Sequence, residues 1–303
     1  MIKKIILKAL NQKIRKIKPI IGKGDVNEIF IIELENKKVL LRINSKLEGL
    51  EEFKKEAWCI EKARIKGVLG ANILSIGKYK NFSYMIYEFI EGKSGKEINN
   101  KKEIWATIGK YAKLINSIKV KGYGLRFSPE KTEFIESWDK FINYGIESLK
   151  EGDRLIELKV YKREQLQIIK KYFLDLKKSK MNMGLVHNDL SLRNVVVDKE
   201  GKVFLIDWGC ACANFVPHTE FVEILGAGYM DLGIPTKEEI NHFLKGYGIS
   251  KKQFEIIKKE ISKFLLLVSF DKLRWAIDKS PKDIEEMTKI AKKRLAYALK
   301  INK

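Results

Sequence analysis

Cysteine is scarce in this chain, and its placement excludes a disulfide framework. Three cysteines occur among 303 residues, at Cys59, Cys210 and Cys212. An odd number at these spacings offers no pairing scheme of the kind that stabilises small secreted domains. A metal site at Cys210 and Cys212 has only His218 nearby and lacks a fourth ligand. We therefore expect small buried thiols in a reduced compartment.

Long apolar runs are also missing. The most apolar stretch, residues 264–270, is far shorter than the roughly 20 residues of a membrane-spanning helix. The basic and apolar segment 1–8 lacks the sustained apolar core and the small-residue cleavage site of a signal peptide. These features predict a cytoplasmic protein with no membrane partner. Hydrophobic residues make up 45% of the chain, which is ample for one large domain or two lobes.

Acidic residues are few compared with basic ones, and the formal net charge is +21. Such a charge is typical of nucleic-acid-binding proteins. However, only nine of the 60 basic residues are arginine, and the lysines are spread along the whole chain. No segment alternates aromatic with basic residues. We therefore predict a solvated, lysine-rich surface without a specific nucleic-acid partner, and a nucleic-acid-binding protein remains an alternative that rests on charge alone.

Apolar patterning changes near residue 90. Before it, apolar runs separated by turn signals predict strands at residues 28–34, 39–43, 73–79 and 82–89, around a single helix at 50–66. After it, helical patterns dominate, at residues 102–118, 134–149, 163–178, 237–247, 251–277 and 281–299. The polar junction at Glu91 and Gly92 is a plausible hinge. The predicted domains are residues 1–90, a β-sheet with one helix, and residues 91–303, a mostly helical region.

One segment carries the chemistry of the chain. His187, Asp189 and Asn194 form the pattern H-x-D-x-x-x-x-N, and a D-W-G follows with Asp207 eighteen residues after Asp189. Two apolar runs joined by a turn, at 195–197 and 203–206, predict a hairpin between the two motifs. Phosphoryl transfer requires a carboxylate near the acceptor hydroxyl and oxygen ligands that hold Mg²⁺ against the nucleotide phosphates. This arrangement supplies both.

The two motifs resemble the catalytic loop and D-F-G motif of the protein-kinase-like superfamily. The D-W-G form is closer to the aminoglycoside-phosphotransferase-like branch, whose members are small-molecule kinases. The resemblance implies an α+β, bilobal fold with a small β-rich N-lobe and a larger, mostly helical C-lobe. It implies that Asp189 is the catalytic base and that His187 and Arg193 belong to the same catalytic site. It also implies that Asn194 and Asp207 bind Mg²⁺. It also implies ATP as the phosphate donor, with GTP as an alternative.

A short glycine-containing segment precedes the first clear strand and is a candidate phosphate-binding loop. Gly22 and Gly24 form a G-x-G, and Asn27 occupies the position of a third glycine. Glycines let backbone amides approach a phosphate closely. A lone G-x-G is more often only a turn, and its place upstream of a catalytic loop is what favours the nucleotide-binding interpretation.

A cationic residue within the next strand is a second candidate for contacting the nucleotide. Arg42 lies where a kinase has the lysine that contacts the phosphates, and the alternative is an edge-strand arginine facing solvent. Its predicted partner is Glu56 on the inward face of the helix, with Glu52 and Glu61 as alternatives.

The segment 85–92 resembles the linker of the family. By that resemblance, the backbone at Glu88 and Ile90 would bind adenine.

The acceptor side is less specific. A helical pattern begins within about ten residues of Gly209, which leaves little room for the peptide-docking segment of a protein kinase. Glu220, Glu223 and Asp231 are candidates for contacting a cationic acceptor, although solvated helix carboxylates explain them equally well. The resemblance implies a small-molecule acceptor such as an aminoglycoside, amino sugar or amino alcohol. The alternatives are a protein kinase and a catalytically inactive nucleotide-binding scaffold, and the intact Asp189, Asn194 and Asp207 argue against the scaffold.

Overall fold

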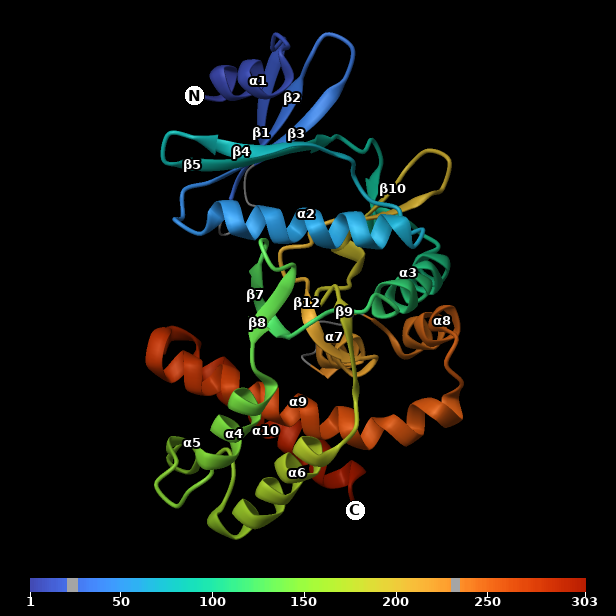
Figure 1. The fold of residues 1–303 in the computed structure, drawn as a ribbon. Helices are drawn as coiled ribbons and strands as arrows, with labels where there is room; N and C mark the ends of the chain where they lie inside the picture. The colour runs from blue at the N-terminus through green and yellow to red at the C-terminus, as the bar shows by residue number, and fades with distance from the viewer. Residues whose placement is uncertain (21–26, 230–234) are drawn as a thin grey trace.

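The structure, a computed structural model, describes residues 1–20, 27–229 and 235–303. An antiparallel β-sheet with its helices forms the upper part in Figure 1, and a mostly helical part lies below it. This arrangement confirms the predicted α+β fold with a β-rich N-terminal region and a helical C-terminal region.

Five antiparallel strands form the N-terminal sheet in the order β1-β2-β3-β5-β4. Their bounds are Lys16–Ile20 (β1), Glu28–Glu33 (β2), Lys38–Asn44 (β3), Ile73–Tyr79 (β4) and Phe82–Glu88 (β5). Side chains alternate between the faces of β3, as the period of two requires. Val39, Leu41 and Ile43 pack into a buried cluster on one face, while Arg42 lies on the other.

Two helices accompany this sheet, whereas the sequence predicted one. The helix α1, Ile2–Leu10, was not predicted, and its Ile5 and Ile6 are fully buried in the cluster with β3. The predicted helix is α2, Gly49–Ile65, whose Phe53 packs with Met85 and Tyr87 on the opposite face. The basic, apolar start of the chain is therefore an amphipathic helix with a structural role.

Two smaller sheets connect the N-terminal part to the helices. Their orders are β11-β10-β6 and β8-β7-β12-β9. The strands are Lys93–Ser94 (β6), Tyr123–Ser128 (β7), Glu133–Glu136 (β8), Asn182–Val186 (β9), Val195–Val197 (β10), Val203–Leu205 (β11) and Cys212–Val216 (β12). The predicted hairpin between the two motifs is present as β10 and β11. The predicted helix over 134–149 is wrong at its start, because the first residues pair with β7 as strand β8.

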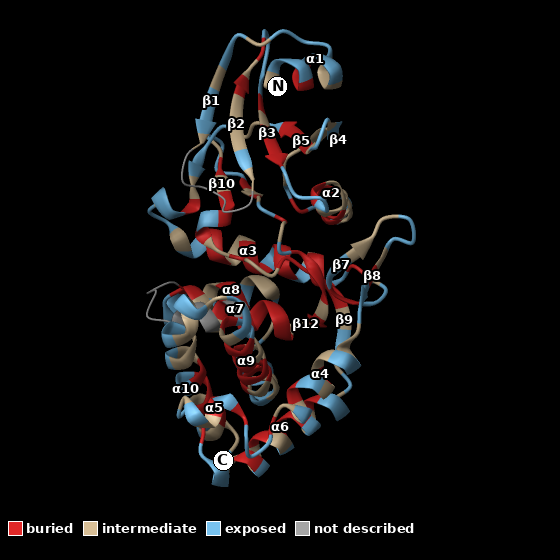
Figure 2. Cartoon of the chain, turned by 90° about the vertical axis from the view of Figure 1, so that its left-hand side faces the viewer, coloured by how far each residue is buried: buried red, intermediate tan, exposed pale blue. Residues whose placement is uncertain are grey.

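Helices make up the rest of the C-terminal part. They are Lys101–Asn116 (α3), Trp138–Glu147 (α4), Arg154–Glu157 (α5), Leu166–Lys178 (α6), His218–Tyr229 (α7), Lys237–Tyr247 (α8), Lys251–Lys279 (α9) and Ile284–Ile301 (α10). The centre of α9 is buried through Phe264–Leu267 and Phe270, and Figure 2 shows it enclosed by the other helices. None of the helices in the described ranges is long and apolar enough to cross a membrane.

Candidate active site

The loop after β9 carries the acidic residue of the H-x-D motif. Asn194 Nδ2 donates hydrogen bonds of 2.8 Å to both the backbone oxygen and Oδ2 of Asp189. Arg193 Nη2 lies 2.8 Å and 3.0 Å from the two carboxylate oxygens. The side chain of Asp189 remains 24% exposed, so it is both oriented by its neighbours and accessible from solvent.

His187 connects this loop to the D-W-G. Its side chain is fully buried, packs edge-on against Trp208, and places Nε2 3.2 Å from the carbonyl oxygen of Ile206. A carbonyl oxygen only accepts hydrogen bonds, so Nε2 carries the proton. Burial lowers the pKa of His187 to about 4. A neutral, buried ring stabilises the backbone and does not shuttle protons near neutral pH.

The hairpin brings the second motif beside the first. The N–H of Ile206 donates to the carbonyl oxygen of Asn194 at 2.9 Å, which places Asp207 next to the loop that carries Asp189 and Asn194. Asp207 has a φ of 61°, an uncommon conformation for a residue other than glycine. Because Nδ2 of Asn194 is used by Asp189, the amide Oδ1 of Asn194 is the atom that remains for a ligand.

The pair expected from the sequence is present between β3 and α2. Arg42 Nη1 and Nη2 lie 2.6 Å and 3.1 Å from the two oxygens of Glu56, and Nη1 also donates to the hydroxyl of Tyr87. Both charged residues are more than 90% buried. Burial opposes the charge of Arg42, but Tyr87 and Glu56 outweigh it and raise the arginine pKa. Arg42 therefore remains a buried cation on the sheet face that carries α2.

Lys55 is a residue that the sequence interpretation missed. Its side chain is buried, and Nζ donates a 2.7 Å hydrogen bond to the carbonyl oxygen of Gly209 in the D-W-G. The sequence offered little signal, because successive helix residues lie about 100° apart and a long lysine side chain beside an inward-facing Glu56 ordinarily reaches solvent. Consecutive residues of α2 thus contact the D-W-G and the cation on β3.

The other residues predicted to bind the nucleotide lie at the start of β2, at the end of β5 and outside the described residues. Gly22 and Gly24 lie outside the described residues, and Asn27 immediately precedes β2. Glu88 ends β5, and its N–H already donates to the carbonyl oxygen of Asn72 at 2.9 Å. Ile90 lies two residues after Glu88 and is half-buried. The nucleotide roles of these residues stay predictions.

The acceptor role predicted for Glu220 does not agree with its surroundings. Glu220, on α7, is fully buried and accepts the backbone N–H groups of His187 at 2.7 Å and Asn188 at 3.4 Å. Its carboxylate is thus buried and hydrogen-bonded to the backbone of the loop after β9, an arrangement that does not suit contact with an acceptor. Glu223 lies on α7 with its side chain outside the described part, and Asp231 lies outside the described residues.

The cysteines agree with the predicted absence of disulfides, with one correction. None of the three is in a disulfide, and Cys59 and Cys212 are buried, but Cys210 is exposed. Burial raises the pKa of Cys59 to about 12, so this thiol stays protonated. Within the described ranges, no group of three or more histidine, cysteine or acidic side chains is arranged to hold a metal ion.

Comparisons with known proteins agree with this geometry. A phosphotransferase enzyme family matches residues 17–248. No curated protein matches the chain significantly. Among solved structures, a thermostable mutant of aminoglycoside phosphotransferase APH(4)-Ia, in a ternary complex with AMP-PNP and hygromycin B, has a TM-score of 0.69 at 15% identity and covers 97% of both chains.

Two further solved structures have the same fold. Spectinomycin phosphotransferase APH(9)-Ia, in complex with ADP and spectinomycin, has a TM-score of 0.59 at 17% identity, covering 96% of this chain and 92% of that one. A putative fructosamine-3-kinase from Haemophilus somnus has a TM-score of 0.63 at 16% identity, covering 97% and 96%. At these identities the likeness establishes the fold, and the chemistry must be argued from the residues.

Proposed function

The chain belongs to the phosphotransferase enzyme family, and from that membership we propose that it transfers the γ-phosphate of ATP to a hydroxyl group of a small molecule. The observation that carries the proposal is the side-by-side placement of Asp189, Asn194 and Asp207 on one loop and one hairpin. A binding module without catalysis has no need for a partly exposed, oriented carboxylate at Asp189.

Asp189 receives or orients the proton of the acceptor hydroxyl. Arg193 and Asn194 fix both oxygens of its carboxylate, so that one direction of approach is favoured. In a largely dissociative transfer, this positioning contributes as much as basicity does. His187 acts through the backbone as a positioning residue, because its ring is buried and neutral.

Asp207 and the amide oxygen of Asn194 fit Mg²⁺, a hard cation that prefers oxygen ligands and keeps several waters. One carboxylate and one amide suffice when nucleotide phosphates supply the remaining ligands. When bound, the ion neutralises charge on the phosphates during transfer. Lys55 and His187 hold the backbone on either side of Asp207, at Gly209 and Ile206.

Arg42 supplies a cation for the phosphates on the N-terminal side. Glu56 holds the guanidinium in place through two hydrogen bonds, as the lysine–glutamate pair does in kinases. The nucleotide would lie between residues 1–90 and 91–303, with adenine against the backbone at Glu88 and Ile90. ATP is the proposed donor, and GTP is the alternative.

The acceptor is proposed to be a small polyhydroxylated or cationic molecule. Helix α7 begins at His218, nine residues after Gly209, which leaves little room for a peptide-docking segment. The solved structures of this fold include complexes with hygromycin B and spectinomycin. Glu223 and Asp231 remain candidates for an acceptor contact. A protein kinase is the second candidate function, and the short segment disfavours it.

A turnover screen tests the proposal. The protein is incubated with labelled ATP and Mg²⁺, with a panel of aminoglycosides, amino sugars, amino alcohols and sugars, and with generic protein substrates. We expect label on at least one small molecule, and loss of that label by orders of magnitude in Asp189→Asn. Label on proteins alone would refute the small-molecule acceptor, and unchanged turnover in Asp189→Asn would refute the assigned base.

A further inference from the structure

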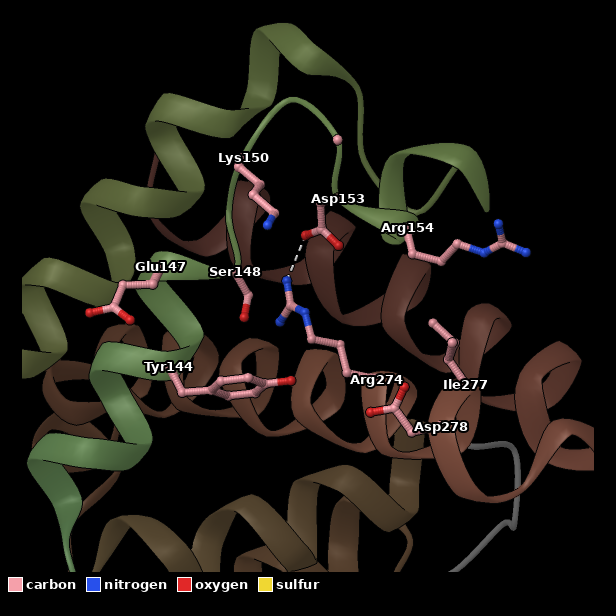
Figure 3. Close-up of a pocket in the computed structure, with 10 residues that line it drawn as sticks. Tyr144, Glu147, Ser148, Lys150, Asp153, Arg154, Arg274, Ile277 and Asp278 are labelled. Carbon is pink, nitrogen blue, oxygen red and sulfur yellow. Dashed lines mark hydrogen bonds and ion pairs between the residues drawn. The ribbon is translucent and has the colours of Figure 1, made fainter.

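A pocket of about 390 Å³ lies where the connection between α4 and α5 meets the C-terminal end of α9. It is at the α5 end of the helical part, apart from β9, whose last residue leads into the catalytic loop (Figure 1). Charged and hydroxyl-bearing side chains line most of it, as Figure 3 shows. The proposed phosphate transfer makes no use of this pocket.

Arg274 is the anchor of the pocket. It is only 8% exposed, and its Nη2 donates a 2.6 Å hydrogen bond to Oδ2 of Asp153. Asp153 also accepts hydrogen bonds from the hydroxyl of Tyr161 and the N–H of Leu155, at 2.8 Å and 3.1 Å. Three donors therefore share the negative charge of Asp153. The guanidinium retains further N–H groups that Asp153 does not occupy, in a fork that suits planar or tetrahedral oxyanions.

Other donors converge on the same space. Figure 3 shows the ammonium of Lys150 and the hydroxyls of Ser148 and Tyr144 directed toward the region beside the Arg274 guanidinium. Of the lining carboxylates, Glu147 points away from this region, whereas Asp278 lies on the α9 side of it. The centre thus carries two cations and two hydroxyls, and Asp153 is already hydrogen-bonded. Asp278 is the opposing carboxylate of the lining, and Asp271 also interacts electrostatically with Arg274.

We propose that this pocket is a second binding site, which takes a small oxyanion, a carboxylate or a phosphate group, between Lys150 and Arg274. The two cations supply charge-assisted hydrogen bonds, and Ser148 and Tyr144 donate neutral ones. Because Arg274 is held in place by Asp153, little side-chain entropy is lost on binding. Asp278 limits the affinity by repulsion.

Matched variants test the proposal with phosphate and acetate as the probes. The melting temperature is measured as each anion is titrated against sodium chloride of equal ionic strength, and an apparent Kd is fitted. Arg274 is left intact, because removing it would leave Asp153 buried without its cation. Lys150→Gln should weaken binding about tenfold, the effect of losing one charge-assisted hydrogen bond. Asp278→Asn should strengthen it, because a repulsive charge is removed.

Lys171→Gln on the exposed face of α6 is the control for net charge. The chain carries +21, so any anion stabilises it non-specifically, and the nucleotide site is identical in all variants. Opposite shifts in Lys150→Gln and Asp278→Asn, with Lys171→Gln equal to the unmodified protein, would support the site. Equal affinities in Lys150→Gln and Lys171→Gln would overturn it. Comparing phosphate with acetate then distinguishes tetrahedral from planar ligands.

Discussion

Lys55 Nζ donates a 2.7 Å hydrogen bond to the carbonyl oxygen of Gly209, although the two residues are 154 positions apart. The next residue, Glu56, holds Arg42 on β3. One turn of α2 therefore joins the sheet that carries the proposed phosphate contact to the loop that carries Asp207. If α2 moved, both the cation and the proposed metal ligand would lose their supports together.

Replacing Lys55 should impair phosphate transfer without unfolding the protein. In Lys55→Met the aliphatic part of the side chain is preserved, but the bond to Gly209 is lost and the D-W-G loop is less constrained. We expect kcat/KM for ATP to fall at least tenfold in Lys55→Met. The fall should be smaller in Lys55→Arg, because arginine keeps a hydrogen-bond donor. Lys54→Met is the matched control, because the adjacent side chain is 40% exposed. Equal activity of Lys55→Met and Lys54→Met would contradict a positioning role.

The local motif was predictable because its chemistry lies within 25 residues of sequence. His187, Asp189, Asn194 and the D-W-G keep fixed spacings on one loop and one hairpin, and short-range patterns identify both. The Arg42–Glu56 pair was also predictable, since helix and strand periodicity place both on facing surfaces.

Contacts between residues far apart in the sequence were not predictable in the same way. Glu220 was a candidate acceptor contact because it lies in the helical segment after the D-W-G, where the resemblance implies acceptor contacts. Its actual partners are backbone N–H groups 32 and 33 residues earlier. Helix α1 was missed because segment 1–8 was weighed only as a possible signal peptide, whereas its Ile5 and Ile6 bury one face against the sheet. In both cases tertiary packing decided the outcome.

The Arg42–Glu56 pair should matter for phosphates and not for adenosine. Removing Arg42 alone leaves Glu56 buried without a partner, at a cost of about 3–5 kcal/mol in unfolding free energy. The double variant Arg42→Met with Glu56→Gln avoids that unpaired charge. We expect it to bind ATP at least tenfold more weakly while its affinity for adenosine, measured by calorimetry, hardly changes. An equal loss for both ligands would indicate damage to the adenine site instead.

Arg42→Lys separates charge from geometry. Lysine keeps the positive charge but loses the planar fork that makes two hydrogen bonds to Glu56. We expect partial retention of ATP affinity, between the unmodified protein and the double variant. Affinity as low as that of the double variant would mean that the charge by itself contributes nothing.

Glu220→Gln should loosen the catalytic loop. The substitution preserves shape, but the amide group is neutral and can present an N–H toward the backbone donors of His187 and Asn188. We expect a loss of about 1–3 kcal/mol in unfolding free energy, the range for an imperfectly satisfied buried group. We also expect faster amide hydrogen exchange at residues 187–189 and a lower kcat with little change in KM for ATP. An exchange rate equal to that of the unmodified protein would contradict this role.

His187 should make stability depend on pH below neutrality. Its folded pKa is about 4, because burial disfavours the charged ring, against about 6.5 in an unfolded chain. The unfolded state then binds more protons, so the stabilisation is complete above pH 6.5 and is lost as the pH falls toward 4. Between pH 7 and pH 5 we expect a loss of about 2 kcal/mol in unfolding free energy, measured by urea denaturation.

His187→Gln isolates this effect from the other titrating groups. Glutamine cannot titrate, and its amide can still donate to the carbonyl oxygen of Ile206. The variant should be less stable than the unmodified protein at pH 7, because Trp208 loses its aromatic neighbour. The difference in unfolding free energy between the two proteins should shrink by about 2 kcal/mol at pH 5. At that pH only the unmodified protein is destabilised by protonation of His187 in the unfolded state. A difference that stays constant from pH 7 to pH 5 would mean that His187 is not held neutral in the folded state, and that its ring is free to exchange protons beside Asp189.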